Sequence, residues 1–596
     1  MSPSKTTTDP EHHGTVVTEA KDPSNERPIP SYANSAFGSD AIADTLRALD
    51  IPYVALTPGS SFRGLHDSLV NYLGNERPQI LVCLHEEHAV AIAHGYAKVT
   101  GRPMAAAVHA NVGLFHATMA IFNAWCDRHP VIVIGATGPV DAEKRRPWID
   151  WIHTASDQGS LVRNYVKWDD QPASPGAARQ ALVRAAWIAE TPPKGPVYVN
   201  LDVELQEAPL TEPLPKISVE KFMPVAAPSA PAAIIDRTAE ILAAAKQPVI
   251  LIGRVSRSLA AWDARVALAE RIFGRVITDL KLGAGFPTDH PLHVPSPAVF
   301  PETAAVETVR KADVVLSLDW VDLAGMLKAS FGGEAPSATV VQVSLDHYLH
   351  NGWSMDHQAL PPVDLFLAGD PDTVVPELLR ALKVGKEPAG AAVSPEGPRQ
   401  APQQRGAIDI DALGFALLAA CHKRDVSLLH VPLQWNGGIW PFRHPLDFIG
   451  TWGGGGIGGG PGISVGAALA LRGSGRLPVA VLGDGDFLMG ATAVWTAAHY
   501  GIPLLIVVAN NQTYFNDEVH QERVARARGR PLENRWIGQR MRDPELDLCA
   551  IARGQGAVAV GPVREAERLM AAFAEAIVAV DRGAVAVVDV RVGQTD

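Results

Sequence analysis

The chain has 596 residues, of which 47% are hydrophobic and 19% are charged, and its formal net charge is −12. A chain of this length is expected to form about three or four domains, and its composition is typical of a globular enzyme. The acidic balance argues against a general nucleic-acid-binding protein. The sequence contains no run of about 18 apolar residues and no secretory signal pattern, so neither a membrane span nor export is expected.

The four cysteines, Cys83, Cys126, Cys421 and Cys549, lie far apart in the chain and include no Cys-x-x-Cys pair. This spacing predicts neither a zinc site nor a disulfide framework. It is typical of a protein that works in a reducing, cytoplasmic setting.

Three long segments alternate between strand-like and helix-like patterns, and polar or Pro-rich stretches separate them. Each such segment predicts a doubly wound parallel sheet, so the expected fold class is α/β with three domains. The N-terminal stretch is rich in Thr, Ser, Pro, Glu and His, which predicts disorder. In chain order, the expected leader, domain, linker, domain, linker and domain are 1–33, 34–205, 206–230, 231–385, 386–408 and 409–593.

Polar side chains follow three predicted strands of the first domain. Short apolar runs predict strands over 53–56, 80–84, 104–108 and 131–135. Ser60 and Ser61 follow the first of these strands, Glu86 follows the second, and His109 and Asn111 follow the third. Open α/β sheets bind ligands at the carboxyl ends of their strands, so these residues are candidates for an active site.

The middle domain carries two arginines after its first predicted strand. Strands are predicted over 248–252, 276–279, 314–318 and 339–343. Arg254 and Arg257 have two readings: they bind the phosphate of a nucleotide, or they are surface arginines on a loop.

The last domain contains the stretch around which the chain is organised. The apolar runs 479–482 and 504–508 predict two strands, with a crossover helix over 491–500. Gly483-Asp484-Gly485-Asp486 follows the first strand, and Gly483 and Gly485 predict a sharp turn there. Asn510-Asn511-Gln512-Thr513 follows the second. Mg²⁺ takes oxygen ligands, which the Asp484 carboxylate, the Asn511 side chain and the Thr513 carbonyl offer, and a diphosphate would complete the set.

A nearly unbroken glycine run, 453–460, precedes a helical pattern over 462–471. Such a run predicts that the backbone approaches another group closely, and the alternative is a flexible loop.

The Gly-Asp-Gly and Asn-Asn pair resembles the thiamine diphosphate motif, since Asp484 and Asn511 are 27 positions apart (511 − 484). The alternative is an ordinary βαβ unit with a glycine turn. The first domain adds further resemblance to the superfamily of acetolactate synthase and benzoylformate decarboxylase, and within it is most similar to benzoylformate decarboxylase. The residues that carry this are Thr57-Pro-Gly-Ser60, His85-Glu86, Gly95-Tyr-Ala97, His109 and Gly195-Pro-Val-Tyr198.

The resemblance implies pyrimidine-binding, central and diphosphate-binding domains and the cofactors thiamine diphosphate and Mg²⁺. It implies that Glu86 contacts the aminopyrimidine, with Glu87 as the alternative because sequence does not orient the two. It places the Gly455 carbonyl and the Ile457 side chain against the cofactor. Gly483, Asp484, Gly485, Asp486 and Asn511 complete the implied cofactor-binding set.

The resemblance also bears on assembly and on a further ligand. In this superfamily one cofactor is bound by two subunits, so a homodimer at least is implied, and a homotetramer is usual. Some relatives hold FAD or ADP in the central domain.

Two residues of the first domain match substrate-handling positions of benzoylformate decarboxylase. His109 matches a proton-transferring histidine, and Ser60 matches a serine that contacts the substrate carboxylate. Each has the alternative of a satisfied polar residue at a strand end. Two departures concern the same chemistry: Met326 stands where the family has a second catalytic histidine, and 429–436 lacks the serines of the family's diphosphate loop.

An arginine-rich segment follows the Asn pair. It is either a lid that grips an anionic substrate, such as a CoA phosphate, or a solvated basic helix. Its arginines within 515–543 are Arg523, Arg526, Arg528, Arg530, Arg535, Arg540 and Arg542.

These residues predict an enzyme that breaks or makes a carbon–carbon bond beside a carbonyl, using thiamine diphosphate and Mg²⁺. Non-oxidative decarboxylation of a 2-oxo acid is the first expectation. A carboligase or lyase, acetolactate-synthase-like or acting on 2-hydroxyacyl-CoA, is the alternative. A third reading is a cofactor-binding protein without turnover.

Overall fold

The computed structural model describes most of the chain, and the expected leader and second linker lie almost entirely outside the described residues. The described residues are 26–29, 34–212, 214–222, 226–349, 359–382, 406–451 and 453–593. Within these ranges no helix combines the length and the apolar character that crossing a membrane requires.

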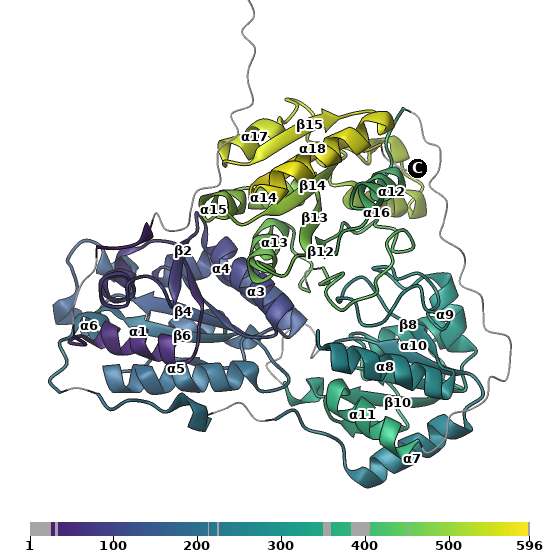
Figure 1. Ribbon diagram of the computed structural model, residues 1–596, viewed down its shortest axis with the longest axis horizontal. Coiled ribbons are helices and arrows are strands. Elements are labelled where there is room, and N and C mark those ends of the chain that lie inside the picture. Colours follow the sequence, from purple (N-terminus) through teal and green to yellow (C-terminus); the bar gives the residue numbers. More distant parts are fainter. Residues whose placement is uncertain are drawn as a thin grey trace, which may run out of the picture.

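Three separate parallel sheets organise the molecule, and helices pack on their faces (Figure 1). The inner strands are rich in Val, Ile, Leu and Ala and are buried along nearly their whole length, as expected for parallel sheets covered on both faces, whereas several edge strands are partly exposed. The prediction of an α/β fold with three doubly wound domains is confirmed.

The first sheet has six strands. In spatial order they are β2 (Gln79–Val82), β1 (Tyr53–Leu56), β3 (Met104–Ala107), β4 (Val131–Thr137), β6 (Val197–Asp202) and β5 (Asp169–Asp170). Its α-helices are α1 (Gly38–Ala48), α2 (Arg63–Asp67), α3 (Glu86–Thr100), α4 (Ala110–Asp127), α5 (Pro175–Glu190) and α6 (Val203–Glu207). Helix α3 begins four residues after β2 and ends at Gly101, whose left-handed φ of 67° favours glycine.

The second sheet has five strands. In spatial order they are β11 (Leu365–Ala368), β10 (Thr339–Ser344), β9 (Val314–Leu318), β7 (Pro248–Ile252) and β8 (Arg275–Ile277). Its helices are α7 (Ala232–Ala244), α8 (Leu259–Ile272), α9 (Thr303–Arg310), α10 (Leu323–Phe331) and α11 (Pro371–Ala381).

The third sheet also has five strands. In spatial order they are β12 (Val426–His430), β13 (Leu477–Gly483), β14 (Leu504–Asn510), β16 (Val585–Arg591) and β15 (Val558–Val563). Its helices are α12 (Ile410–Ala420), α13 (Gly459–Ala470), α14 (Asp484–Gly490), α15 (Ala493–His499), α16 (Phe515–Ala527), α17 (Leu548–Gly554) and α18 (Leu569–Asp581).

The connection after β13 differs from the prediction of a glycine turn and one helix over 491–500. Helix α14 begins directly at Asp484, and Gly485 lies in its first turn without a positive φ. A β-carbon at Gly485 would lie 2.8 Å from the Tyr514 ring, so this glycine makes room for a side chain instead of turning the backbone.

The first and third domains meet through α3 and α13, which lie side by side between their two sheets (Figure 1). The helices approach so closely that a β-carbon at Gly95 would lie 1.9 Å from the Ile463 carbonyl oxygen, and one at Gly466 equally close to that of Ile92. Glycine at these two positions therefore allows the first and third domains of one chain to pack closely together.

Candidate active site

The carboxyl edge of the first sheet gathers a serine and a histidine. Ser61 Oγ lies 2.7 Å from His109 Nδ1, and Ser61 is buried. A β-carbon at Gly59 would lie 2.2 Å from the His109 ring, so the backbone after β1 packs directly against this imidazole. The hydrogen bond engages Nδ1, which leaves Nε2 as the ring nitrogen able to exchange a proton with a ligand.

Glu86 lies next to this pair. Its carboxylate is buried at the start of α3, and His116 Nδ1 of α4 lies 3.1 Å from its Oε2. Glu86 is also close enough to His109 for their charges to interact. Glu87 points elsewhere: it interacts with Asp486 of the third domain, and burial raises the pKa of Glu87. The structure thus orients the two glutamates, which the sequence did not.

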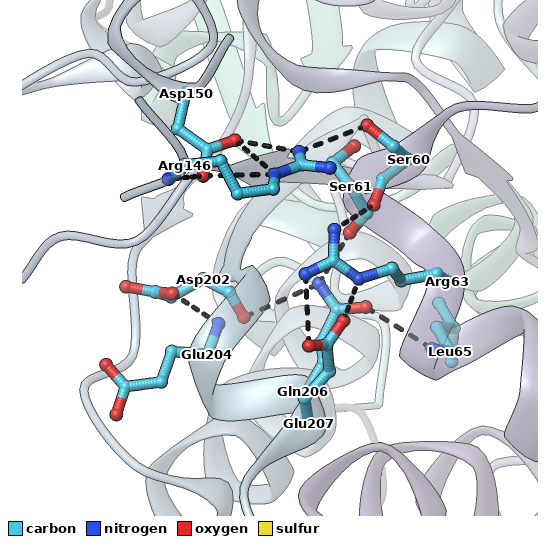
Figure 2. A network of polar contacts seen from close by, with 10 residues as sticks. All are labelled: Ser60, Ser61, Arg63, Leu65, Arg146, Asp150, Asp202, Glu204, Gln206 and Glu207. Carbon is cyan, nitrogen blue, oxygen red and sulfur yellow. Dashed lines mark hydrogen bonds and ion pairs between the residues drawn. The ribbon is translucent and has the colours of Figure 1, made fainter. Parts of the chain in front are cut away.

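The loop after β4 brings two further groups to this edge. Arg146 donates from Nε and Nη2 to the buried Asp150, and its Nη2 also lies 3.4 Å from Ser60 Oγ. Figure 2 shows the Arg146 guanidinium held between Asp150 and Ser60. From the same loop, the His153 ring lies edge-on to His109, with 4.7 Å between ring centroids. Ser60 itself is exposed, and the partner of His109 is Ser61.

The surroundings of His109 favour its neutral form by lowering its pKa. Partial burial is the main cause that lowers its pKa, and the positive charges that His153 and Arg146 carry when protonated lower it further. Glu86 acts in the opposite direction and is the smaller influence compared with burial.

The carboxyl edge of the third sheet holds the expected metal ligands. Asp484 Oδ1 accepts a 2.8 Å hydrogen bond from Gly485 N, and Asp484 Oδ2 accepts one from Gln512 N. Asn511 Oδ1 accepts from Thr513 N at 3.0 Å. The carboxylate that follows β13 is therefore tied to the turn that follows β14. Burial raises the pKa of Asp484 to about 6, since only backbone N–H groups stabilise its charge.

Asp486 fixes the glycine run. Its Oδ1 accepts hydrogen bonds from Gly458 N at 2.6 Å and Gly460 N at 3.2 Å. The run lies directly on α4, because a β-carbon at Gly454 would lie 2.6 Å from Asn123 Oδ1 and one at Gly456 would lie 2.5 Å from Met119. The sequence-based expectation of a close backbone approach is met, with α4 as the group approached.

The donor set of this edge fits a divalent cation and a diphosphate. Asp484 offers a buried, desolvated carboxylate, and Asn511 offers an amide oxygen, which are the oxygen types that Mg²⁺ selects. Asp486 Oδ2 is buried and accepts no hydrogen bond from the described residues. Ile457 and Gly455 stand exposed at the tip of the glycine run, where a ligand can reach them.

One buried carboxylate links the arginine-rich segment to residues 511–513 after β14. We call these residues the metal turn, after the role expected for Asn511 and Thr513. The Glu518 side chain is 0% exposed; its Oε1 accepts from Thr513 Oγ1 at 2.6 Å, and Arg540 donates to both of its oxygens. Arg526 and Arg535 pair with Glu522. Within the described part of the chain, the arginines of this segment that make no ion pair are Arg523, Arg528, Arg530 and Arg542.

The carboxyl edge of the central sheet is closed by ion pairs. The Arg254 side chain is 9% exposed and lies 3.7 Å from Asp319 and 3.4 Å from Asp346, and Arg128 of the first domain donates to Asp346 at 2.6 Å. Arg257 lies within hydrogen-bonding distance of the backbone carbonyls of Ala284 and Ile449.

The structure corrects one sequence-based reading of Arg254 and Arg257. Both guanidinium groups are bound by protein acceptors, so they are not free surface arginines. The other reading, a phosphate of FAD or ADP, stays a prediction, and the carboxylates of Asp319 and Asp346 beside Arg254 would repel such a group. Met326 is buried in the core of this domain and reaches no ligand edge.

A cavity of about 2100 Å³ lies between the central and third domains. Its lining includes Trp435 and Asn436 from the segment expected to bind diphosphate. It includes none of Glu86, Asp484 and Asn511. The segment after β12 therefore faces, at least in part, a space separate from the metal turn.

Sequence reasoning missed His116, Arg146, His153 and Glu518. His116 lies seven residues after His109 on one helix, so helical spacing could have pointed to it. Arg146 and His153 belong to an irregular loop whose path no periodic pattern predicts, and Glu518 stands out only once its burial is known.

Comparison with known proteins agrees with this arrangement. Three family models match consecutive parts of the chain: the N-terminal TPP binding domain of thiamine pyrophosphate enzymes at residues 37–161, the central domain at 235–378 and the C-terminal TPP binding domain at 433–590.

Curated relatives and solved structures extend the comparison. Benzoylformate decarboxylase of Pseudomonas aeruginosa is 26% identical over 498 residues, covering 80% of this chain and 85% of that protein. The acetolactate synthase large subunit of Corynebacterium glutamicum is 26% identical over 556 residues, covering 90% and 84%. The crystal structure of benzoylformate decarboxylase from Polynucleobacter necessarius has the same fold, with a TM-score of 0.75, 21% identity and coverage of 94% and 99%.

The three matched domains, their order and the edges at which their polar residues gather lead to one conclusion: this chain belongs to the family of thiamine pyrophosphate enzymes.

Proposed function

We propose that the protein is a thiamine diphosphate- and Mg²⁺-dependent enzyme that decarboxylates a 2-oxo acid without oxidation. The main support for this proposal is that one chain has polar residues at the carboxyl edges of both its first and its third sheet. Glu86, Ser61 and His109 gather at the first sheet, and Asp484 is tied to the Asn511 turn at the third. The packing of α3 on α13 joins the two domains that carry these edges, and a second subunit is expected to complete each cofactor site.

Each residue has a role that its chemistry suits. Asp484, Asn511 and the Thr513 carbonyl would hold Mg²⁺ and through it the diphosphate, and Gly483, Gly485 and Asp486 would shape that edge. Glu86 would hold the aminopyrimidine, and the Gly455 carbonyl and the Ile457 side chain would contact the cofactor. When bound, the cofactor supplies a nucleophilic carbon and an electron sink. His109 moves protons, and Ser60, beside Arg146, contacts the substrate carboxylate.

The relatives support a decarboxylase, and one also supports a rival. The Pseudomonas aeruginosa protein is a benzoylformate decarboxylase, whereas the Corynebacterium glutamicum protein is an acetolactate synthase subunit. The rival function is a carboligase or 2-hydroxyacyl-CoA lyase. It is favoured by the four arginines near the metal turn that lack carboxylate partners. A binding protein without turnover is disfavoured, because Glu86, Asp484 and Asn511 are all present and placed at ligand-binding edges.

We also propose that the enzyme forms a homodimer at least, and a homotetramer as the complete assembly. The loop after β4 exposes Trp148 and Trp151 to 73% and 70%. Clustered apolar exposure of this kind marks a protein–protein interface. Light scattering coupled to size-exclusion chromatography tests this, and a monomer at micromolar concentration would refute it.

Turnover with added thiamine diphosphate and Mg²⁺ tests the function. A panel of 2-oxo acids and 2-hydroxyacyl-CoA esters is followed by mass detection of CO₂, aldehyde and free CoA products. We expect equal amounts of CO₂ and aldehyde from a 2-oxo acid. Cleavage of a CoA ester with no turnover of 2-oxo acids would replace the decarboxylase with the lyase.

A further inference from the structure

Decarboxylation to an aldehyde requires two proton transfers at neighbouring atoms. The 2-oxo acid anion and one proton give CO₂ and an aldehyde, so one proton is taken up overall. The bond to CO₂ breaks, and its electron pair is later used to form a C–H bond with a delivered proton. The neighbouring oxygen, which is protonated during the reaction, must give up its proton before the aldehyde leaves. Two groups on different elements can share these tasks without one having to reorient.

The first sheet presents two imidazoles in contact. His109 follows β3, and His153 follows the long connection after β4; their ring centroids are 4.7 Å apart with planes at 78°. His109 Nδ1 is engaged by Ser61 Oγ at 2.7 Å. His153 is only half-buried, so it can exchange protons with water.

The backbone of His153 is fixed by the loop that carries it. Asp150 is buried and pairs with Arg146, and its carbonyl accepts from His153 N at 3.1 Å and from Thr154 Oγ1 at 2.6 Å. The His153 carbonyl in turn accepts from Gly138 N at 2.9 Å. An ion pair and three hydrogen bonds thus fix the backbone that carries the His153 ring beside His109, and such positional order favours proton transfer.

Charged groups around the pair influence the pKa of His109 in both directions. Glu86 raises this pKa, whereas burial, a protonated His153 and Arg146, the cation paired with Asp150, lower it, and burial has the largest effect. A lowered pKa lets His109 give up its proton more readily, which suits a proton donor.

We propose that His153 is the second proton-transfer residue of this enzyme. His109 delivers the proton to the carbon that has lost CO₂, and His153 removes the proton from the neighbouring oxygen and returns it to solvent. This assignment rests on the proposed decarboxylation. It is specific to this chain, in which the central domain offers only the buried Met326 at the position of the family's second histidine.

The test compares His153→Gln with the wild-type enzyme and with His422→Gln. Gln keeps a polar side chain without an ionisable ring, and His422 is an exposed histidine at the end of α12, remote from this edge. The first readout is single-turnover release of CO₂ and of aldehyde over pH 5.5–8.5. We expect His153→Gln to keep CO₂ release within about threefold of wild type and to slow aldehyde release by about 10²-fold, as for loss of a general base. His422→Gln should match wild type in both.

The second readout needs no turnover. The rate at which diethyl pyrocarbonate labels His109 is measured against pH by peptide mass spectrometry. We expect the pKa of His109 to rise in His153→Gln, because a neighbouring positive charge has been removed, and to stay unchanged in His422→Gln.

The outcomes separate the two proposals. Unchanged aldehyde release in His153→Gln would overturn the role of His153 while leaving the decarboxylase intact. Equal slowing of CO₂ and aldehyde release would also overturn it, because it would show a structural role only. If the wild-type enzyme turns over no 2-oxo acid, the decarboxylase fails, and the role of His153 in decarboxylation fails with it. The labelling experiment then still decides the contact: an unshifted His109 would refute the coupled pair as well.

Discussion

The central and third sheets each have five parallel strands, but the side chains at their carboxyl edges differ. At the central edge, Arg254 and Arg128 pair with the partly buried carboxylates of Asp319 and Asp346. At the third edge, Asp484 is more deeply buried, and its described hydrogen bonds come from backbone N–H groups. Every parallel α/β sheet has a carboxyl edge at which a ligand can bind. The charges of the side chains at that edge then determine whether it binds one.

This difference teaches how to recognise the working edges of a multidomain α/β enzyme. A buried carboxylate with a protein cation beside it is already compensated, and it serves stability or domain docking. A buried carboxylate without one is costly until a ligand supplies the missing charge. By that criterion we expect the third edge, where no described cation pairs with Asp484, to bind a cation, and the central edge to serve as a junction between the first and central domains.

The largest expected effect comes from the first edge. Glu86→Gln removes the carboxylate proposed to contact the aminopyrimidine, and we expect a loss of kcat of about 10²–10⁴-fold at saturating cofactor. Glu87→Gln is the matched control, since Glu87 faces Asp486, and it should retain activity within a few-fold. Steady-state kinetics measures both. Full activity of Glu86→Gln, or the larger loss in Glu87→Gln, would show that the assignment is reversed.

The central edge should respond in the opposite manner. Asp346→Asn leaves Arg128 and Arg254 without their shared carboxylate, so we expect unfolding to become easier by about 3–5 kcal/mol. The kcat of the folded protein should not change, because no proposed catalytic group is touched. Urea denaturation and initial rates provide the two measurements. A large loss of kcat with unchanged stability would mean that the central edge takes part in the reaction.

Mild acid should weaken the interface between the active domains. Burial lowers the pKa of His88 to about 4, and His88 Nε2 lies 2.8 Å from Thr492 Oγ1 across this interface. The unfolded chain protonates this imidazole near pH 6.5, so below that pH the unfolded state binds more protons than the folded state. The contribution of His88 is complete above about pH 6.5 and falls by up to about 3 kcal/mol as pH approaches 4.

Thermal unfolding of the metal-free protein between pH 4.5 and 8 measures this dependence. His88→Gln should unfold at a lower temperature than wild type at pH 8 and lose less on acidification. His293, whose pKa is also lowered to about 4 by burial in the central domain, remains in both proteins and sets the residual slope. If the unfolding temperature depends on pH equally in the two proteins, His88 does not contribute to the loss of stability in acid.

The sequence predicted where the strands end better than it predicted the structure and the residues found at those ends. Short Val- and Ile-rich runs located the strands, so residues directly after them, such as Glu86, His109 and Asp484, could be placed at an edge. The start of α14 was missed because Gly-Asp-Gly favours a turn locally, and packing against Tyr514 decides otherwise.

Contributions from long irregular loops could not be predicted. Arg146 and His153 reach His109 through a loop whose path depends on the buried Asp150 ion pair, which is a tertiary interaction. The same applies to Arg254: its position after a strand suggested a phosphate site, and only the folded chain brings Asp346 to it from another strand.

A smaller effect is expected at the link between the metal turn and the arginine-rich segment. Glu518→Gln weakens the ion pair with Arg540 and loosens the hydrogen bond to Thr513. We expect the affinity for Mg²⁺, measured by fluorescence titration with thiamine diphosphate present, to fall by about 10–100-fold, as for residues that orient metal ligands. The kcat at saturating Mg²⁺ should be nearly unchanged.

Glu522→Gln is the control for this experiment. Glu522 forms ion pairs with Arg526 and Arg535 in the same segment. Unlike Glu518, it is not described as a partner of Thr513. It should leave Mg²⁺ affinity within about twofold. If both variants lose affinity equally, the effect belongs to folding of the whole segment and not to Glu518.

The smallest effect should distinguish a lid from a solvated helix. Arg526 is held by Glu522, so a substrate-gripping role falls to the exposed Arg528 and Arg530, which have no carboxylate partner in the described chain. Replacing these two by Ala should raise KM for an anionic substrate by about three- to tenfold at low ionic strength, and less at high salt, because exposed charges are screened. Arg526→Ala, which removes an arginine already paired, is the control and should change KM less. An unchanged KM in the double variant at low salt would leave the segment as a basic helix whose contact with the site is the Glu518 link alone.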